Sequence, residues 1–141
     1  GYLKYIVTVE DLSEEQYGHT HGAVMAISIG SNSADKYGNI LAALAWLRST
    51  FNEVRCSSVY LTPPVSGVGE DYCNAVAMCR TRPQDTPETV TRMLKEYESA
   101  HGRTEHIVTI DLDLVIYSGD ILRPKDFQRE YFQHGYMEIL H

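Results

Sequence analysis

The stretch Ile107-Val-Thr-Ile-Asp-Leu-Asp-Leu-Val-Ile-Tyr117 carries a pair of acidic residues inside an apolar run, and it decides the fold. Its β-branched and aliphatic residues predict a strand. Because successive side chains of a strand point to opposite faces, Asp111 and Asp113 lie on the same face. We expect the other face to pack against helices through a set of aliphatic side chains: Ile110, Leu112, Leu114 and Ile116.

Asp111 and Asp113 require a cation beside them. Neighbouring carboxylates repel each other, and burying either of them without a partner is costly. The sequence leaves two alternatives for this cation. One is an Arg or Lys side chain from a neighbouring strand. The other is Mg²⁺, a hard ion that binds one or two carboxylates together with phosphate oxygens and water.

The chain before this strand begins with a strand and a helix. Residues 23–30 predict a buried strand that ends at Gly30, and Ser33 or Asp35 caps the helix that follows. Apolar residues at helical spacing predict the buried stripe of this helix: Tyr37, Ile40, Leu44, Leu47 and Phe51.

A further pair of strands and a second helix complete the pattern. Residues 54–61 and 72–80 predict strands, separated by a loop rich in proline and glycine. Thr86 caps the second helix, with Pro87 at its first position, and Gly102 ends it. After the acidic strand we expect a turn, a short strand and a polar tail. The order β-α-β-β-α-β predicts an α+β, ferredoxin-like fold: an antiparallel sheet with helices packed on one face.

Length and composition place the chain among globular proteins. The 141 residues fit one domain, and we assign residues 1–22 to an N-terminal extension or linker and residues 23–141 to the domain. The net charge of −7 argues against a nucleic-acid surface. The three cysteines lack metal-binding spacing. No apolar run is long enough to span a membrane and no signal pattern is present, so we expect a cytoplasmic protein.

The helix before the acidic strand ends with candidates for phosphate binding. Arg103 follows the helix end, and its guanidinium can hold a phosphate through two parallel hydrogen bonds. Alternatively, Arg103 satisfies the helix dipole. Glu98 could orient that Arg or contact a ribose, or it could lie on an exposed helix face. Lys95, one turn before, taken alone is a solvated charge.

A second group of residues suits a flat heterocycle. Thr62, Pro63 and Val65 belong to a proline-stiffened loop, in which backbone amides and carbonyls have fixed positions. Asn74 presents a donor and an acceptor together, which matches an amide edge. Tyr72, or a tail aromatic such as Tyr136, could stack on the ring. The alternative is a structural loop with a packed Tyr and a turn Asn.

In combination, these pieces resemble the 6-hydroxymethyl-7,8-dihydropterin pyrophosphokinase family of folate biosynthesis. The resemblance runs from residue 23 to about residue 140, with its pieces in the family's order. The pieces are Ala26-Ile-Ser-Ile-Gly-Ser-Asn32, Ser58-Val-Tyr-Leu-Thr-Pro-Pro64, Asp71-Tyr-Cys-Asn-Ala-Val76, Glu98-x-x-x-Gly102-Arg103, Thr109-Ile-Asp-Leu-Asp-Leu114 and Gly135-Tyr-Met137.

The resemblance implies transfer of the pyrophosphoryl group of ATP to the pterin hydroxymethyl oxygen, with release of AMP. It implies that Asp111 and Asp113 hold two Mg²⁺ ions and that Arg103 acts with them in catalysis. The pterin pocket implied is Thr62, Pro63, Val65, Tyr72, Asn74 and Tyr136. The ATP site implied is Lys95, Glu98, Arg103 and Leu114, to which we add the downstream cations Arg123 and Lys125. The partners implied are small molecules, without nucleic acid or membrane.

The sequence departs from the family on the triphosphate side. The family usually has a longer loop before the acidic strand, with a second Arg, a Trp and a Pro-Arg pair. Here Glu105 and Val108 stand where Arg residues are expected, and the shorter loop has no Trp. Downstream, Lys125 replaces a His after Pro124, and His134 stands where Arg is usual.

These departures predict a slow enzyme, because phosphoryl transfer depends on positioning and charge neutralisation. The available substitutes are Arg103, His106, Arg123, Lys125 and Arg129. One alternative is a degenerate pterin- or nucleotide-binding module of the same fold with little or no catalysis. Another is a ferredoxin-like palm domain that runs two-metal nucleotidyl transfer, against which the acidic surface argues.

Overall fold

The computed structural model describes residues 22–102 and 108–141 of the chain. Apart from Gly22, the expected N-terminal extension or linker lies outside the described residues. In chain order the elements are β1 (Val24–Ser31), α2 (Lys36–Thr50), β2 (Asn52–Cys56), β3 (Tyr60–Thr62), β4 (Tyr72–Arg80), α3 (Pro87–Ala100), β5 (Asp111–Tyr117), β6 (Asp120–Ile121), α4 (Pro124–Phe127) and α5 (Glu130–Leu140).

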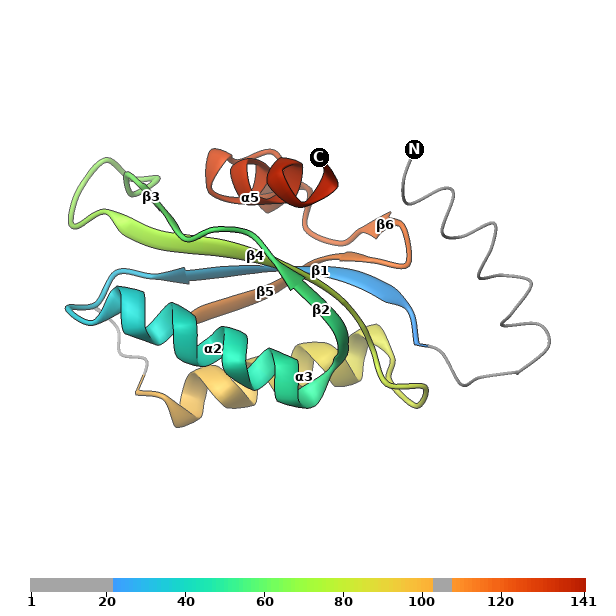
Figure 1. The fold of residues 1–141 in the computed structure, drawn as a ribbon. Coiled ribbons are helices and arrows are strands. Elements are labelled where there is room, and N and C mark those ends of the chain that lie inside the picture. The colour runs from blue at the N-terminus through green and yellow to red at the C-terminus, as the bar shows by residue number, and fades with distance from the viewer. Residues whose placement is uncertain (1–21, 103–107) are drawn as a thin grey trace.

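The strands form one antiparallel sheet. Its order is β2-β4-β1-β5-β6, and β3 pairs with the start of β4. Both helices that the sequence predicted, α2 and α3, lie on one face of this sheet (Figure 1). The ferredoxin-like prediction is therefore confirmed. The strand expected at 54–61 is divided into β2 and β3, because only its two ends pair with β4.

The main core lies between the sheet and these two helices. Alternate residues of β1 point into it, as do Leu112 and Leu114 of β5. Helix α3 begins as predicted: Thr86 is its N-cap, Pro87 is its first residue, and Thr86 and Thr89 form a reciprocal capping box. The stripe predicted for α2 is wrong at its first member, because Tyr37 is 58% exposed. The other members are buried: Ile40, Leu44, Leu47 and Phe51.

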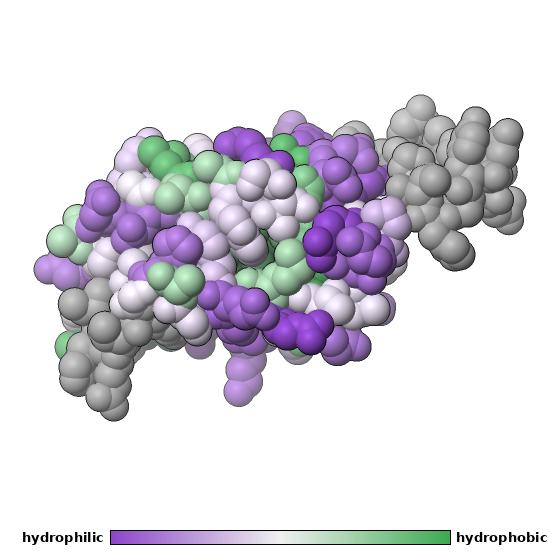
Figure 2. Space-filling view, turned by 90° about the horizontal axis from the view of Figure 1, so that it is seen from below, coloured by the Kyte–Doolittle hydropathy of each residue, from purple (hydrophilic) through white to green (hydrophobic). Residues whose placement is uncertain are grey.

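The outer surface of α2 and α3 is mixed in character. Hydrophilic side chains surround a smaller apolar area on this face (Figure 2). An open groove between the two helices includes Trp46 and Tyr97, whose ring centroids are 4.6 Å apart. This groove shares no lining residue with the cavity described below.

The chain after β6 corrects the sequence analysis. The expected polar tail is helical, and α5 covers the face of the sheet opposite α2 and α3 (Figure 1). It buries a second apolar cluster through Phe132 and Ile139. The spacing of Phe132, Tyr136 and Ile139 is typical of an amphipathic helix, and this signal could have predicted α5.

A bulge in β5 overturns the expected position of Ile116. Ile27 pairs with Leu114 whereas Ala26 pairs with Ile116, so Val115 is an extra residue between these pairs. Ile116 consequently packs beside the α5 cluster instead of the main core. Because the bulge follows Asp113, the acidic pair keeps its predicted common face.

Gly135 permits the close approach of α5 to the sheet. A Cβ atom at this position would lie 2.8 Å from each of three atoms: Ser57 Oγ, Tyr60 Oη and Val76 Cγ2. The Tyr60 hydroxyl is held in place, because it donates to the Tyr131 carbonyl and accepts from the Gly135 amide.

We expect Gly135→Ala to destabilise the protein by about 2 kcal/mol, since overpacking between α5 and the sheet outweighs the gain in helix propensity. Urea unfolding measures the change. Gly38→Ala in α2 is the matched control. There the added Cβ meets only the exposed Asp35 carboxylate, which can turn away, so stability should rise slightly. Equal effects of both substitutions would contradict this account of Gly135.

Candidate functional site

One cavity of about 350 Å³ brings together both groups of residues that the sequence singled out. The loop after β3 supplies one wall, with Thr62, Pro63 and Val65. The opposite side carries Asp111 and Asp113 of β5. The remaining lining residues are Ser28, Gly30, Asn32, Pro64, Ser66, Val68, Tyr72, Asn74 and Tyr131.

Asn74 lies at the floor of the cavity, 3% exposed. Its Nδ2 donates to Thr62 Oγ1 at 2.7 Å and to the Tyr72 carbonyl at 3.2 Å. These acceptors fix the orientation of the amide, since only the nitrogen can donate. Among the described residues none donates a hydrogen bond to Asn74 Oδ1, so this atom can accept one from a ligand.

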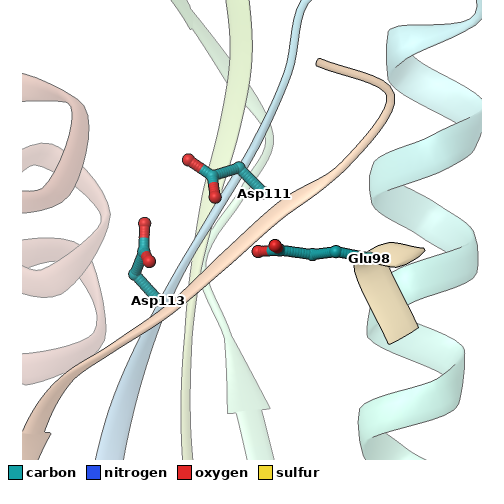
Figure 3. A group of neighbouring side chains, drawn as sticks. All are labelled: Glu98, Asp111 and Asp113. Atoms are coloured by element: carbon teal, nitrogen blue, oxygen red, sulfur yellow. The ribbon is translucent and has the colours of Figure 1, made fainter. Parts of the chain in front are cut away.

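The carboxylates of Asp111, Asp113 and Glu98 converge near the start of β5 (Figure 3). One oxygen from each lies within 4.8 Å of the others. Asp111 and Asp113 point to the α5 side of the strand, whereas Glu98 reaches toward them from α3. Three carboxylate oxygens at this separation suit a hard divalent cation such as Mg²⁺.

Basic side chains also lie beside this acidic group. Lys95 Nζ is 3.1 Å from Asp113 Oδ1, and Arg123 Nε is 3.8 Å from the same oxygen. Burial and the neighbouring Asp111 raise the pKa of Asp113, and the two cations oppose that rise without cancelling it. The cations therefore come from α3 and from the start of α4, and not from a neighbouring strand as the first alternative expected. The carboxylate oxygens also suit a metal ion.

Lys95 and Glu98 hold the main chain of β5 at the acidic pair. Glu98 Oε2 accepts from the Leu112 amide at 2.7 Å, and Lys95 Nζ donates to the Leu112 carbonyl at 3.1 Å. The two side chains also pair with each other at 2.9 Å. Glu98 is 5% exposed, so the expected exposed-face alternative for Glu98 is wrong.

The turn after β1 fixes the segment that leads into β5. The backbone amide of Asn32 donates to the Val108 carbonyl at 3.0 Å, and the side-chain Oδ1 of Asn32 accepts from the Val108 backbone amide at 2.8 Å. Ser31 Oγ donates to the same carbonyl at 3.3 Å. The turn therefore positions the residues just before Asp111.

Three further residues expected in the site do not line the cavity: Leu114, Lys125 and Tyr136. Arg103 lies outside the described residues. Leu114 is 4% exposed in the main core, and Lys125 is exposed on α4. Tyr136 stacks on Phe132, with ring centroids 5.1 Å apart, and does not line the cavity.

Tyr131 lines the cavity, and the sequence analysis missed it because it treated the tail as polar. Its hydroxyl donates to Asp126 Oδ1, and Arg123 Nε donates to the other oxygen of Asp126. Recognition of α5 as a helix packed on the sheet would have been needed to find this residue.

Comparison with protein families matches residues 26–141 to the model described as 7,8-dihydro-6-hydroxymethylpterin-pyrophosphokinase. The chain belongs to this family. The match covers both the cavity and the acidic pair, and it supports pyrophosphokinase activity on a pterin substrate in folate biosynthesis. The family uses ATP and Mg²⁺.

A search of curated protein sequences gave no match. Among the helices of the described residues, none has both the length and the apolar character to cross a membrane.

We expect Glu98→Ala to lower the free energy of unfolding by about 2 kcal/mol, because the Leu112 amide and Lys95 both lose their buried acceptor. Chemical denaturation measures the loss. Glu96→Ala, at an exposed position of the same helix, is the control and should change stability by less than about 0.5 kcal/mol. Similar small effects at both positions would argue against a structural role of Glu98.

Proposed function

We propose that this chain transfers the pyrophosphoryl group of ATP to 6-hydroxymethyl-7,8-dihydropterin. In this step the substrate hydroxyl oxygen bonds to the β-phosphorus, and the bond between that phosphorus and the α–β bridging oxygen breaks. AMP leaves with the bridging oxygen, and the hydroxyl proton passes to solvent. The observation that carries the proposal is that one cavity is lined both by the fixed amide of Asn74 and by the acidic pair Asp111 and Asp113.

The pterin side of the proposal rests on shape and hydrogen bonding. Asn74 Oδ1 would accept from the amide edge of the heterocycle, and the Asn74–Thr62 bond holds it in that orientation. Pro63, Val65 and Tyr72 would form the walls. Because Tyr136 packs on Phe132, we assign the second aromatic wall to Tyr131.

The nucleotide side of the proposal rests on charge. Asp111 and Asp113 would hold two Mg²⁺ ions, which when bound neutralise charge on the triphosphate. Lys95 and Arg123 already lie beside Asp113 and can contact phosphate oxygens. The remaining residues proposed for ATP binding are Glu98, Arg103 and Lys125, whereas the burial of Leu114 in the main core argues against a direct contact of its side chain.

We propose a low rate for this chain. The loop before β5 has fewer arginines than is usual in the family, so the charge that develops on the transferred group is stabilised more weakly. The same feature favours a second candidate function, a module that binds the pterin without chemistry. The two candidates differ in turnover and share the pterin affinity. Small-molecule substrates, as opposed to nucleic acid, agree with the net charge of −7.

Incubation with ATP, Mg²⁺ and the reduced pterin should yield AMP and the pterin diphosphate in equal amounts, measured by ion-exchange chromatography. Omission of the pterin, or chelation of Mg²⁺ with EDTA, should remove both products. A calorimetric titration with the pterin alone runs beside the assay. Pterin binding without AMP above background would exclude the enzyme and favour the binding module.

We expect Asp111→Asn and Asp113→Asn each to reduce turnover at least 100-fold, on the order of the effect of losing a charged group at a reacting phosphate. The substitutions keep side-chain size, so pterin affinity by calorimetry should change less than about threefold. Asp71→Asn, at an exposed position outside the lining of the cavity, is the control. Wild-type turnover in either site variant would rule out the metal role.

A further inference from the structure

Asp126 joins Tyr131, which lines the cavity, to Arg123, which lies beside Asp113. It lies on the short helix α4, and its side chain is 17% exposed. Oδ2 accepts from Arg123 Nε at 2.5 Å, and Oδ1 accepts from the Tyr131 hydroxyl. Both of its oxygens are thus engaged by groups at the edge of the acidic site.

The position of the Arg123 guanidinium depends on a competition between carboxylates. Nε carries a single hydrogen, which Asp126 accepts at 2.5 Å. The distance from Nε to Asp113 Oδ1 is 3.8 Å, beyond hydrogen-bond range, so that contact is electrostatic only. Asp111 is the third carboxylate that interacts with this guanidinium. If Asp126 carried no charge, the two other carboxylates that interact with Arg123 would be Asp111 and Asp113, which we assign to metal binding.

We propose that Asp126 is a positioning residue that holds Arg123 away from Asp113 and thereby keeps the acidic pair open to a divalent cation. This inference rests on the proposed metal site at Asp111 and Asp113. A guanidinium hydrogen-bonded to Asp113 would occupy the same oxygens as the cation and would oppose it by charge.

The Tyr131 hydrogen bond fixes Asp126 from the other side. The Tyr131 carbonyl accepts from the Tyr60 hydroxyl at 2.5 Å, so α5 is tied to β3 at the same residue. Asp126 therefore has an orientation set by the packing of α5 on the sheet. Arg123 is held at a defined distance from the acidic pair and remains close enough to reach a phosphate bound there.

The test measures Mn²⁺ binding by electron paramagnetic resonance, which reports free Mn²⁺ and needs neither nucleotide nor turnover. Asp126→Asn should weaken Mn²⁺ binding about tenfold, the usual order for loss of a residue that supports a metal site. In the background of Arg123→Gln the same substitution should have less than about a twofold effect, because the competing guanidinium is gone. Asp120→Asn, exposed in β6, is the control.

Two results would overturn the proposal. One is an unchanged Mn²⁺ affinity in Asp126→Asn. The other is a loss that persists undiminished when Arg123 is also replaced, since a general disturbance of α4 would produce that pattern. Wild-type protein without saturable Mn²⁺ binding would contradict the proposed metal site itself. Failure of the positioning role alone is therefore distinguished from failure of the proposed function.

Discussion

Repulsion between Asp111 and Asp113 is the constraint on which the site depends. Leu112 lies between them and is fully buried in the main core. If the strand turned so that the acidic side chains faced the core, Leu112 would become exposed to solvent. The two charges must instead be compensated where they are. Lys95, on the helix before β5, and Arg123, just before α4, supply part of this positive charge. The negative charge that Lys95 and Arg123 leave uncompensated favours the binding of a divalent cation.

The compensation extends to the main chain. Lys95 and Glu98 bind the carbonyl and amide of Leu112, so the same helix that supplies a cation also fixes the strand that displays the carboxylates. At the other side, Asn32 holds Val108 just before the strand begins. The acidic pair therefore has little freedom to move apart. This rigidity favours a role in holding metal and phosphate groups in a fixed arrangement.

The packing of α5 connects the two halves of the cavity. Tyr60 of β3 binds the Tyr131 carbonyl, and the Tyr131 side chain binds Asp126 beside Arg123. Gly135 allows this helix to approach the sheet closely enough for these bonds to form. The wall near the fixed amide and the cations near the acidic pair thus depend on one packing interface. Family membership and the shared cavity together support the proposed transfer from nucleotide to pterin.

Local patterns in the sequence were enough to predict the β-α-β-β-α-β succession along the chain, the two helices on one face and the common face of Asp111 and Asp113. They also singled out Thr62 and Asn74, which the structure places in one cavity and joins by a hydrogen bond. These predictions depend on the two-residue period of a strand and on local capping and turn preferences, which short segments encode. The bulge at Val115 could not be predicted this way, because it depends on the pairing of β5 with β1.

The sequence by itself determined on which face of a strand Asp111 and Asp113 lie, because side-chain alternation is a local property. Only the tertiary structure decided which cations approach those acids. Glu98 is buried and Lys95 bridges to β5 because α3 packs against that strand. Tyr131 reaches the cavity and Tyr136 does not because α5 crosses the opposite face. Distances between elements far apart in the chain depend on packing of the whole core, which no short segment specifies.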